Sequence, residues 1–179
     1  MNTREAQIEI GRLNSLGMSR SAIFSRLTGR GVRDSRLAWL VASHVDPRRR
    51  AGNQRHIRIV IAIALVQAVI GCLQAFGIGE QIVPGTGWVT GAVTLAVGLL
   101  FAWGFYRNQA GTYNAYLLMA MVQLPFQLDG FSAAPAGTTI GVATALGLLA
   151  YVWWVRTRVF PDFAFLSPRR IRGSYIFSE

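Results

Sequence analysis

The placement of arginine relative to four apolar runs constrains this chain more than any other feature of its sequence. All eighteen basic residues are arginines, and twelve of them precede the first run, together with only four acidic residues. Five more follow the last run, and Arg107 lies between the second and third runs. The other two connections carry no arginine and only Glu80 and Asp129. Because arginine-rich short segments resist translocation, this pattern predicts that both termini are cytoplasmic.

The apolar runs have the length and composition of membrane-spanning helices. A spanning helix needs about 20 apolar residues, within a range of roughly 17–25. The first two runs meet this length, whereas the third and fourth need their flanking residues or a locally thinner bilayer. The sequence predicts an all-α fold, a four-helix transmembrane bundle in the cytoplasmic (inner) membrane of a bacterium. The four runs cover residues 59–78, 88–106, 113–128 and 139–155.

The chain divides into four parts of different composition. We expect a cytoplasmic helical module, a flexible basic juxtamembrane linker, the transmembrane bundle, and a cytoplasmic tail rich in aromatic residues and arginine. These parts cover residues 1–46, 47–58, 59–155 and 156–179, respectively.

The N-terminal module has the pattern of three short helices separated by glycine-containing turns. Ile8, Leu13 and Leu16 are expected to form the apolar face of the first helix, and Gly17 is suited to end it. The third helix is expected to stop where Asp46 is followed by proline.

The tail alternates aromatic residues with arginines, and Pro161 and Pro168 exclude a long helix there. Such a segment suits the headgroup region of a membrane, or packing back onto the module. An alternative is docking onto a partner as an extended strand, anchored by Tyr175, Ile176 and Phe177. We favour the first interpretation.

Small residues at four-residue spacing predict close helix packing in lipid. Gly87 and Gly91 lie one turn apart in the second run, and Gly137 and Gly141 do so at the start of the fourth. Small residues let two helix backbones approach closely. We expect packing within the chain, with homo-oligomerisation as the alternative.

Four glutamines lie within the apolar runs. Gln67 and Gln74 share one face of the first run, and Gln123 and Gln127 share one face of the third. An amide facing lipid is costly, so these side chains are expected to point into the bundle and bond between helices. The alternative is a polar path for a small solute, continued outward by Glu80 and Asp129. Transport paths usually carry ionisable groups within the membrane, and these runs contain none.

The basic segments that flank the apolar runs predict contact with anionic lipid headgroups. Each arginine near such a surface contributes roughly 1 kcal/mol of attraction. The arginines assigned to this contact are Arg48, Arg49, Arg50, Arg55, Arg58, Arg156 and Arg158.

The module also has some features of a DNA-binding helix-turn-helix, with arginines in and after its second helix. The details fit poorly, because Leu13 stands where a small residue is usual and Arg26 stands at a position expected to be apolar. Nucleic acid is therefore not the partner that we expect.

No catalytic, cofactor or metal site is predicted. The chain has two histidines, His44 and His56, and a single cysteine, Cys72, so it lacks the ligand spacing of a zinc site. It also lacks a phosphate-binding glycine loop, a nucleophile elbow and paired intramembrane acids. We expect a non-enzymatic protein without cofactors.

The C-terminal segment carries a resemblance. Residues 160–177 contain a Phe-Pro-x-x-x-Phe-x-x-Pro stretch, basic residues and a Gly-x-Tyr-Ile-Phe ending. This plan resembles that of small uncharacterised bacterial integral membrane proteins with a short N-terminal helical module before about four spans. The resemblance implies that fold but no activity, and it assigns no functional residue.

Together these features predict a membrane-anchored interaction or accessory subunit that binds a protein partner through its module and tail. Two alternatives stay open. In the first alternative the chain is a component of a small-solute transporter or channel that uses the intramembrane glutamines. In the second it is a membrane-tethered DNA-binding regulator.

Overall fold

The chain forms two units in a computed structural model that describes residues 1–128, 131–132, 134–171 and 173–178. The described residues are mostly helical, which confirms the predicted all-α class. One unit, here called the terminal unit, combines Met1–Ala51 with Arg156–Glu179. The other, the apolar unit, is Gly52–Val155.

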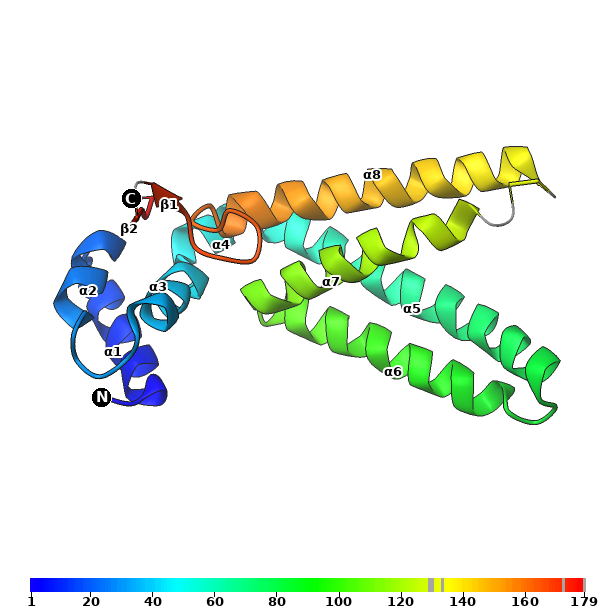
Figure 1. Ribbon diagram of the computed structural model, residues 1–179, viewed down its shortest axis with the longest axis horizontal. Coiled ribbons are helices and arrows are strands. Elements are labelled where there is room, and N and C mark those ends of the chain that lie inside the picture. The colour runs from blue at the N-terminus through cyan, green and yellow to red at the C-terminus, as the bar shows by residue number, and fades with distance from the viewer. Residues whose placement is uncertain (129–130, 133, 172, 179) are drawn as a thin grey trace. The chain divides into compact units, whose positions relative to one another are not determined.

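The terminal unit begins with three helices, as predicted, and ends in a two-stranded antiparallel hairpin (Figure 1). The Asn2 side chain accepts a hydrogen bond from the Glu5 backbone amide, and the Glu5 carboxylate accepts one from the Asn2 amide in return. Gly17 has a φ of 78°, a left-handed conformation that glycine adopts without strain. The elements are α1 (Thr3–Ser15), α2 (Arg20–Leu27), α3 (Asp34–Ser43), α4 (Pro47–Gly52), β1 (Arg170–Ile171) and β2 (Ser174–Tyr175).

The buried face of α1 differs from the predicted one. Ile8 and Leu16 are 65% and 69% exposed, whereas Ala6, Ile10 and Leu13 are buried. The buried residues follow the i, i+4, i+7 spacing of one helix face, and its first member is a small alanine that contributes little to an apolar pattern. The prediction was therefore right for Leu13 and wrong for the other two residues.

The predicted flexible linker is helical. Helix α4 begins at Pro47, a first-turn position where the missing backbone N–H breaks no helical hydrogen bond. The Asp46 carboxylate accepts a hydrogen bond from the Arg48 amide at 2.8 Å and so caps the helix. Only Asn53 separates α4 from the next helix.

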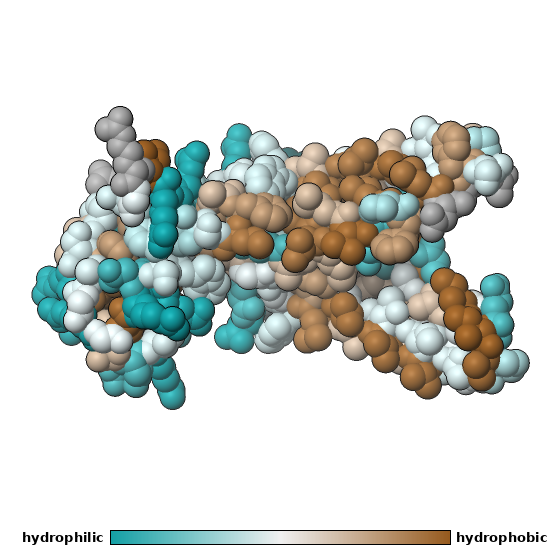
Figure 2. Space-filling view, in the orientation of Figure 1, coloured by the Kyte–Doolittle hydropathy of each residue, from teal (hydrophilic) through white to brown (hydrophobic). Residues whose placement is uncertain are grey.

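The apolar unit contains three described helices that are long and apolar enough to cross a membrane, namely α5, α6 and α8. Only 11–22% of the residues in their most apolar windows are buried, and large side chains such as Leu100 are exposed. Apolar surface gathers along this unit (Figure 2). Exposed apolar surface of this extent is typical of a membrane or protein interface. The elements are α5 (Gln54–Ile82), α6 (Gly87–Tyr106), α7 (Ala110–Gln123), the 3₁₀ helix η1 (Pro125–Leu128) and α8 (Pro135–Val159).

The third predicted span is not one long helix. Helix α7 has 14 residues and rises about 21 Å at 1.5 Å per residue, less than the ~30 Å of a bilayer core. It ends just before Pro125, which has no backbone N–H to continue the ladder of hydrogen bonds, and the chain passes into η1. The expected kink at Pro125 is thus a helix end, and the prediction of four helices of spanning length is wrong for this segment.

Candidate binding sites in the two units

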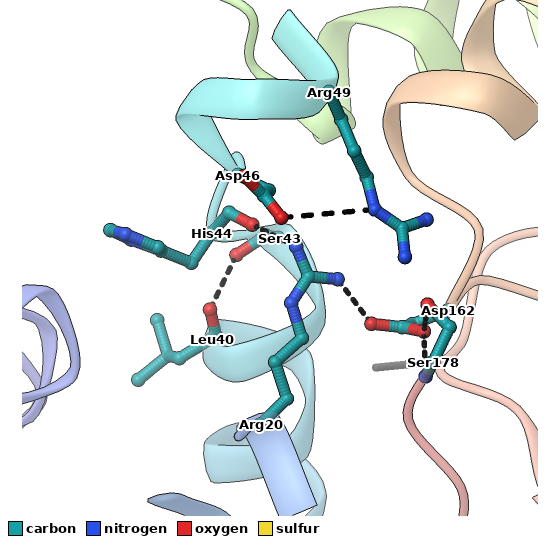
Figure 3. A network of polar contacts seen from close by, with 8 residues as sticks. All are labelled: Arg20, Leu40, Ser43, His44, Asp46, Arg49, Asp162 and Ser178. Carbon is teal, nitrogen blue, oxygen red and sulfur yellow. Dashed lines mark hydrogen bonds and ion pairs between the residues drawn. The ribbon is translucent and has the colours of Figure 1, made fainter. Parts of the chain in front are cut away.

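A buried ion pair joins the tail to the N-terminal helices in the terminal unit (Figure 3). The Arg20 guanidinium of α2 binds one oxygen of Asp162, and the two residues are 8% and 1% exposed. Arg20 also donates to the carbonyl of His44 at 3.0 Å. The second Asp162 oxygen accepts hydrogen bonds from the amide and hydroxyl of Ser178, both at 2.6 Å. Each charged group therefore has a hydrogen-bond partner besides the other, which offsets part of the cost of burying the pair.

Aromatic contacts attach the tail to the same helices. Phe24 of α2 lies against Tyr175 and Phe177, with ring centroids 5.4 and 5.5 Å apart. The rings of Trp39 of α3 and Phe163 are nearly perpendicular, with their centroids 6.3 Å apart. The tail thus packs back onto the module, which agrees with one of the two settings that we favoured. The Phe177 side chain, expected to anchor a strand on a partner in the alternative interpretation, is instead buried within this unit.

The packing of the tail also covers part of the helix that a DNA-binding interpretation would use, although Arg26 of that helix stays exposed. In such a module α2 would enter the major groove. Here Arg20 is buried in its ion pair, and Phe24 is covered by tail aromatics.

Arg156 departs from the group of arginines assigned to lipid headgroups. It is 1% exposed and donates to the backbone carbonyls of Ala164 and Phe165, so it holds the tail rather than facing outward. Arg49 is half-buried and pairs with Asp46 at 3.9 Å. The remaining members of the group are exposed, namely Arg48, Arg50, Arg55, Arg58 and Arg158.

His44 is expected to make the stability of the terminal unit depend on pH. Burial lowers the pKa of His44 below its usual value, and the nearby Arg20 lowers it further, while Asp46 acts in the opposite direction. The unfolded chain therefore takes up a proton at His44 at a higher pH than the folded chain does. We expect the melting temperature of the full-length protein to fall as pH decreases from 7.5 through the ordinary histidine pKa of about 6.5. The fall should be smaller in His44→Gln; an unchanged pH profile in this variant would contradict the role of His44.

The four predicted glutamines line a single cavity in the apolar unit. The cavity has a volume of about 620 Å³, and its wall includes residues of α5, α6, α7, η1 and α8. Gln67 and Gln74 reach it from α5, Gln123 from α7 and Gln127 from η1. The hydroxyl of Tyr116 donates to Gln67 Oε1 at 2.6 Å, a bond between α5 and α7. Inter-helix bonding, our favoured interpretation, is thus present at Gln67.

Glu80, one of the two acids expected to extend a polar path, does not line this cavity. Glu80 accepts hydrogen bonds from the amides of Gly85 and Gly87 at 3.0 and 2.9 Å. It thereby caps the N-terminus of α6, where a negative charge is favourable. Asp129 lies outside the described residues.

The predicted packing glycines separate into two groups. A Cβ on Gly87 would lie 2.7 Å from the Phe76 carbonyl oxygen, and one on Gly91 would lie 3.2 Å from that of Cys72. These two glycines therefore lie at the contact between α5 and α6. A Cβ on Gly137 would meet only Ala134 at 4.0 Å, and one on Gly141 would meet nothing within 4 Å. The α8 pair does not serve packing within the described chain.

His56 and Cys72, which could in principle take part in chemistry, make contacts between helices instead. His56 of α5 has its Nδ1 3.0 Å from the Tyr151 hydroxyl of α8 and its ring against Trp154. Cys72 is half-buried beside Gly91. Among the described residues, no three His, Cys, Asp or Glu side chains gather to hold a metal ion.

Sequence reasoning missed Tyr116 and the Arg20–Asp162 pair. Asp162 was the only acid of the described tail, which was a signal that it needed a basic partner, but many arginines competed for that role.

No protein family, curated protein or solved structure matches the chain. The ion pair of the terminal unit and the cavity of the apolar unit are therefore the features that bear on function.

Proposed function

We propose that the chain is a multi-pass inner-membrane protein that acts as an anchored interaction subunit, with the terminal unit as its binding face. The observation that carries this proposal is the packing of both ends of the chain into one folded unit, held by the buried Arg20–Asp162 pair. Short cytoplasmic ends that served only to set topology would need no shared core.

The same packing bears on the number of crossings. Two segments that fold together lie on one side of a membrane, so the chain between them crosses it an even number of times. Helices α5, α6 and α8 are long and apolar enough to make three of these crossings. We assign the fourth to α7 continued by η1, which together rise about 29 Å. The arginine distribution supports a cytoplasmic side for the terminal unit, and a bacterial inner membrane is part of this proposal.

The surface of the terminal unit indicates what kind of partner it suits. Arg26, Arg30, Arg33 and Arg36 are exposed on α2, α3 and the loop between them, and Asp34 is the only acid among them. The Arg36 guanidinium lies 5.0 Å from the Trp39 ring centroid, which holds the arginine in place. Such a surface is complementary to an acidic protein. The exposed arginines of α4, α5 and α8 would contact anionic headgroups.

Capture from native membranes tests the interaction role. We expect a stoichiometric acidic protein to co-purify with the full-length chain and to be recovered about tenfold less with an Arg30→Ala/Arg33→Ala variant. These two side chains are exposed, so the variant should keep its fold.

The matched control is Arg55→Ala/Arg58→Ala, which removes the same charge from exposed positions of α5. It should retain the partner. The proposal would be abandoned if the full-length chain captured no stoichiometric protein, or if both double variants lost it equally.

A second candidate function is binding or transport of a small molecule through the apolar unit. The specific observation in its favour is that glutamines from three helical segments line one cavity. Membrane-tethered DNA binding has less support, because Arg20 is buried and the tail covers Phe24.

A further inference from the structure

The glutamine-lined cavity has the composition of a site for a neutral ligand. None of its lining residues is charged. Its polar groups are four primary amides, the Tyr116 hydroxyl and the Thr94 hydroxyl, and its other walls are formed by apolar residues such as Phe101 and Leu148 together with Gly71 and Gly98. An ion in a low-dielectric site needs an opposite charge or many dipoles around it. The cavity is therefore suited to an uncharged molecule with an apolar body.

The hydrogen-bonding capacity of this cavity is not used up within the chain. The Gln67 carbonyl oxygen is occupied by the Tyr116 hydroxyl, which leaves the Nε2 hydrogens of Gln67 for another acceptor. Within the described part of the chain, the side-chain amides of Gln74, Gln123 and Gln127 make no hydrogen bond. Amides within the hydrocarbon core cannot rely on water, so each favours a bound partner.

We propose that this cavity binds a neutral amphiphile whose carbonyl oxygens accept hydrogen bonds from the glutamine amides while its apolar part packs on α6 and α8. The volume of about 620 Å³ suits a ring with an alkyl chain, since small-molecule pockets measure roughly 300–1,000 Å³. The proposal rests on the proposed membrane insertion of the apolar unit but not on a protein partner.

The test uses the full-length protein in a neutral detergent and decylubiquinone as the probe, a benzoquinone with a ten-carbon chain. Native mass spectrometry over a range of probe concentrations gives stoichiometry and Kd. We expect one molecule to bind saturably. Decylbenzene, which has the chain and a ring but no oxygen, should bind at least tenfold more weakly if the amides donate hydrogen bonds to the quinone carbonyls.

Variants locate the site. Gln67→Leu and Gln123→Leu should each weaken decylubiquinone binding about 3- to 10-fold, the loss expected for one hydrogen bond. The matched control is Gln81→Leu, on the same helix as Gln67 but outside the cavity, and it should leave Kd unchanged. If a glutamine variant fails to fold, Ala145→Phe is the second test. It places a ring in the cavity from α8 without removing a polar group, so it should weaken decylubiquinone binding.

The proposal would be overturned if decylubiquinone did not bind, if decylbenzene bound equally well, or if the cavity and control variants had the same Kd. These outcomes are separate from failure of the interaction role, because the glutamine variants leave the arginines of the terminal unit intact and should still capture the partner protein.

Discussion

Replacing Asp162 with alanine is expected to lower the free energy of unfolding of the terminal unit by about 3–5 kcal/mol. The Arg20 guanidinium would then be a buried charge without its carboxylate, and the amide and hydroxyl of Ser178 would lose their acceptor. A loss of this size is a large fraction of the stability of an ordinary domain. It would appear as faster proteolysis of the tail in the full-length protein and as a lower melting temperature in detergent.

The matched control for this variant is Glu9→Ala. Glu9 is half-buried and pairs with the exposed Arg12 at 3.8 Å on α1, so its loss should change stability by less than about 1 kcal/mol. A double variant, Arg20→Met/Asp162→Leu, removes both charges and should recover much of the lost stability. Equal effects of Asp162→Ala and Glu9→Ala would show that the buried pair does not hold the tail.

Replacing Gly98 with alanine is expected to destabilise the apolar unit by about 1–3 kcal/mol. The added Cβ would lie 2.3 Å from the Cβ of Ala68 and 2.9 Å from its Cα. Because one of these atoms is backbone, no rotamer change relieves the overlap, and α5 and α6 have to move apart. Thermal unfolding in detergent, followed by the far-ultraviolet circular dichroism of the helices, measures the effect.

The opposite result is expected for Gly141→Ala on α8. Its Cβ would meet nothing within 4 Å, and alanine is favoured over glycine within a helix by about 1 kcal/mol. This variant should be neutral or slightly more stable. A similar loss in both variants would mean that the α5–α6 contact does not decide the effect of Gly98→Ala on stability.

Local properties of the chain carried the correct predictions. Runs of apolar residues, glycine turns and capping side chains act within a few residues. Three of the four predicted apolar runs therefore coincide with long helices, and the three helices of the module were also located. Features that depend on specific contacts in the folded chain were harder to predict. Pro125 was correctly read as a disturbance, but whether it kinks α7 or ends it depends on the packing around it. The basic linker likewise became helical because Asp46 caps it, an interaction that composition does not express.

The sequence by itself determined the long apolar helices, the arginine asymmetry and the pairing of glutamines on the faces of single segments, because each is a local pattern. Only the tertiary structure decided that Gln67 and Gln123 share one cavity, since this depends on how α5 and α7 are rotated about their axes. It alone decided that Arg20 pairs with Asp162, 142 residues away, because several arginines had the same charge and only packing buried this one beside the carboxylate.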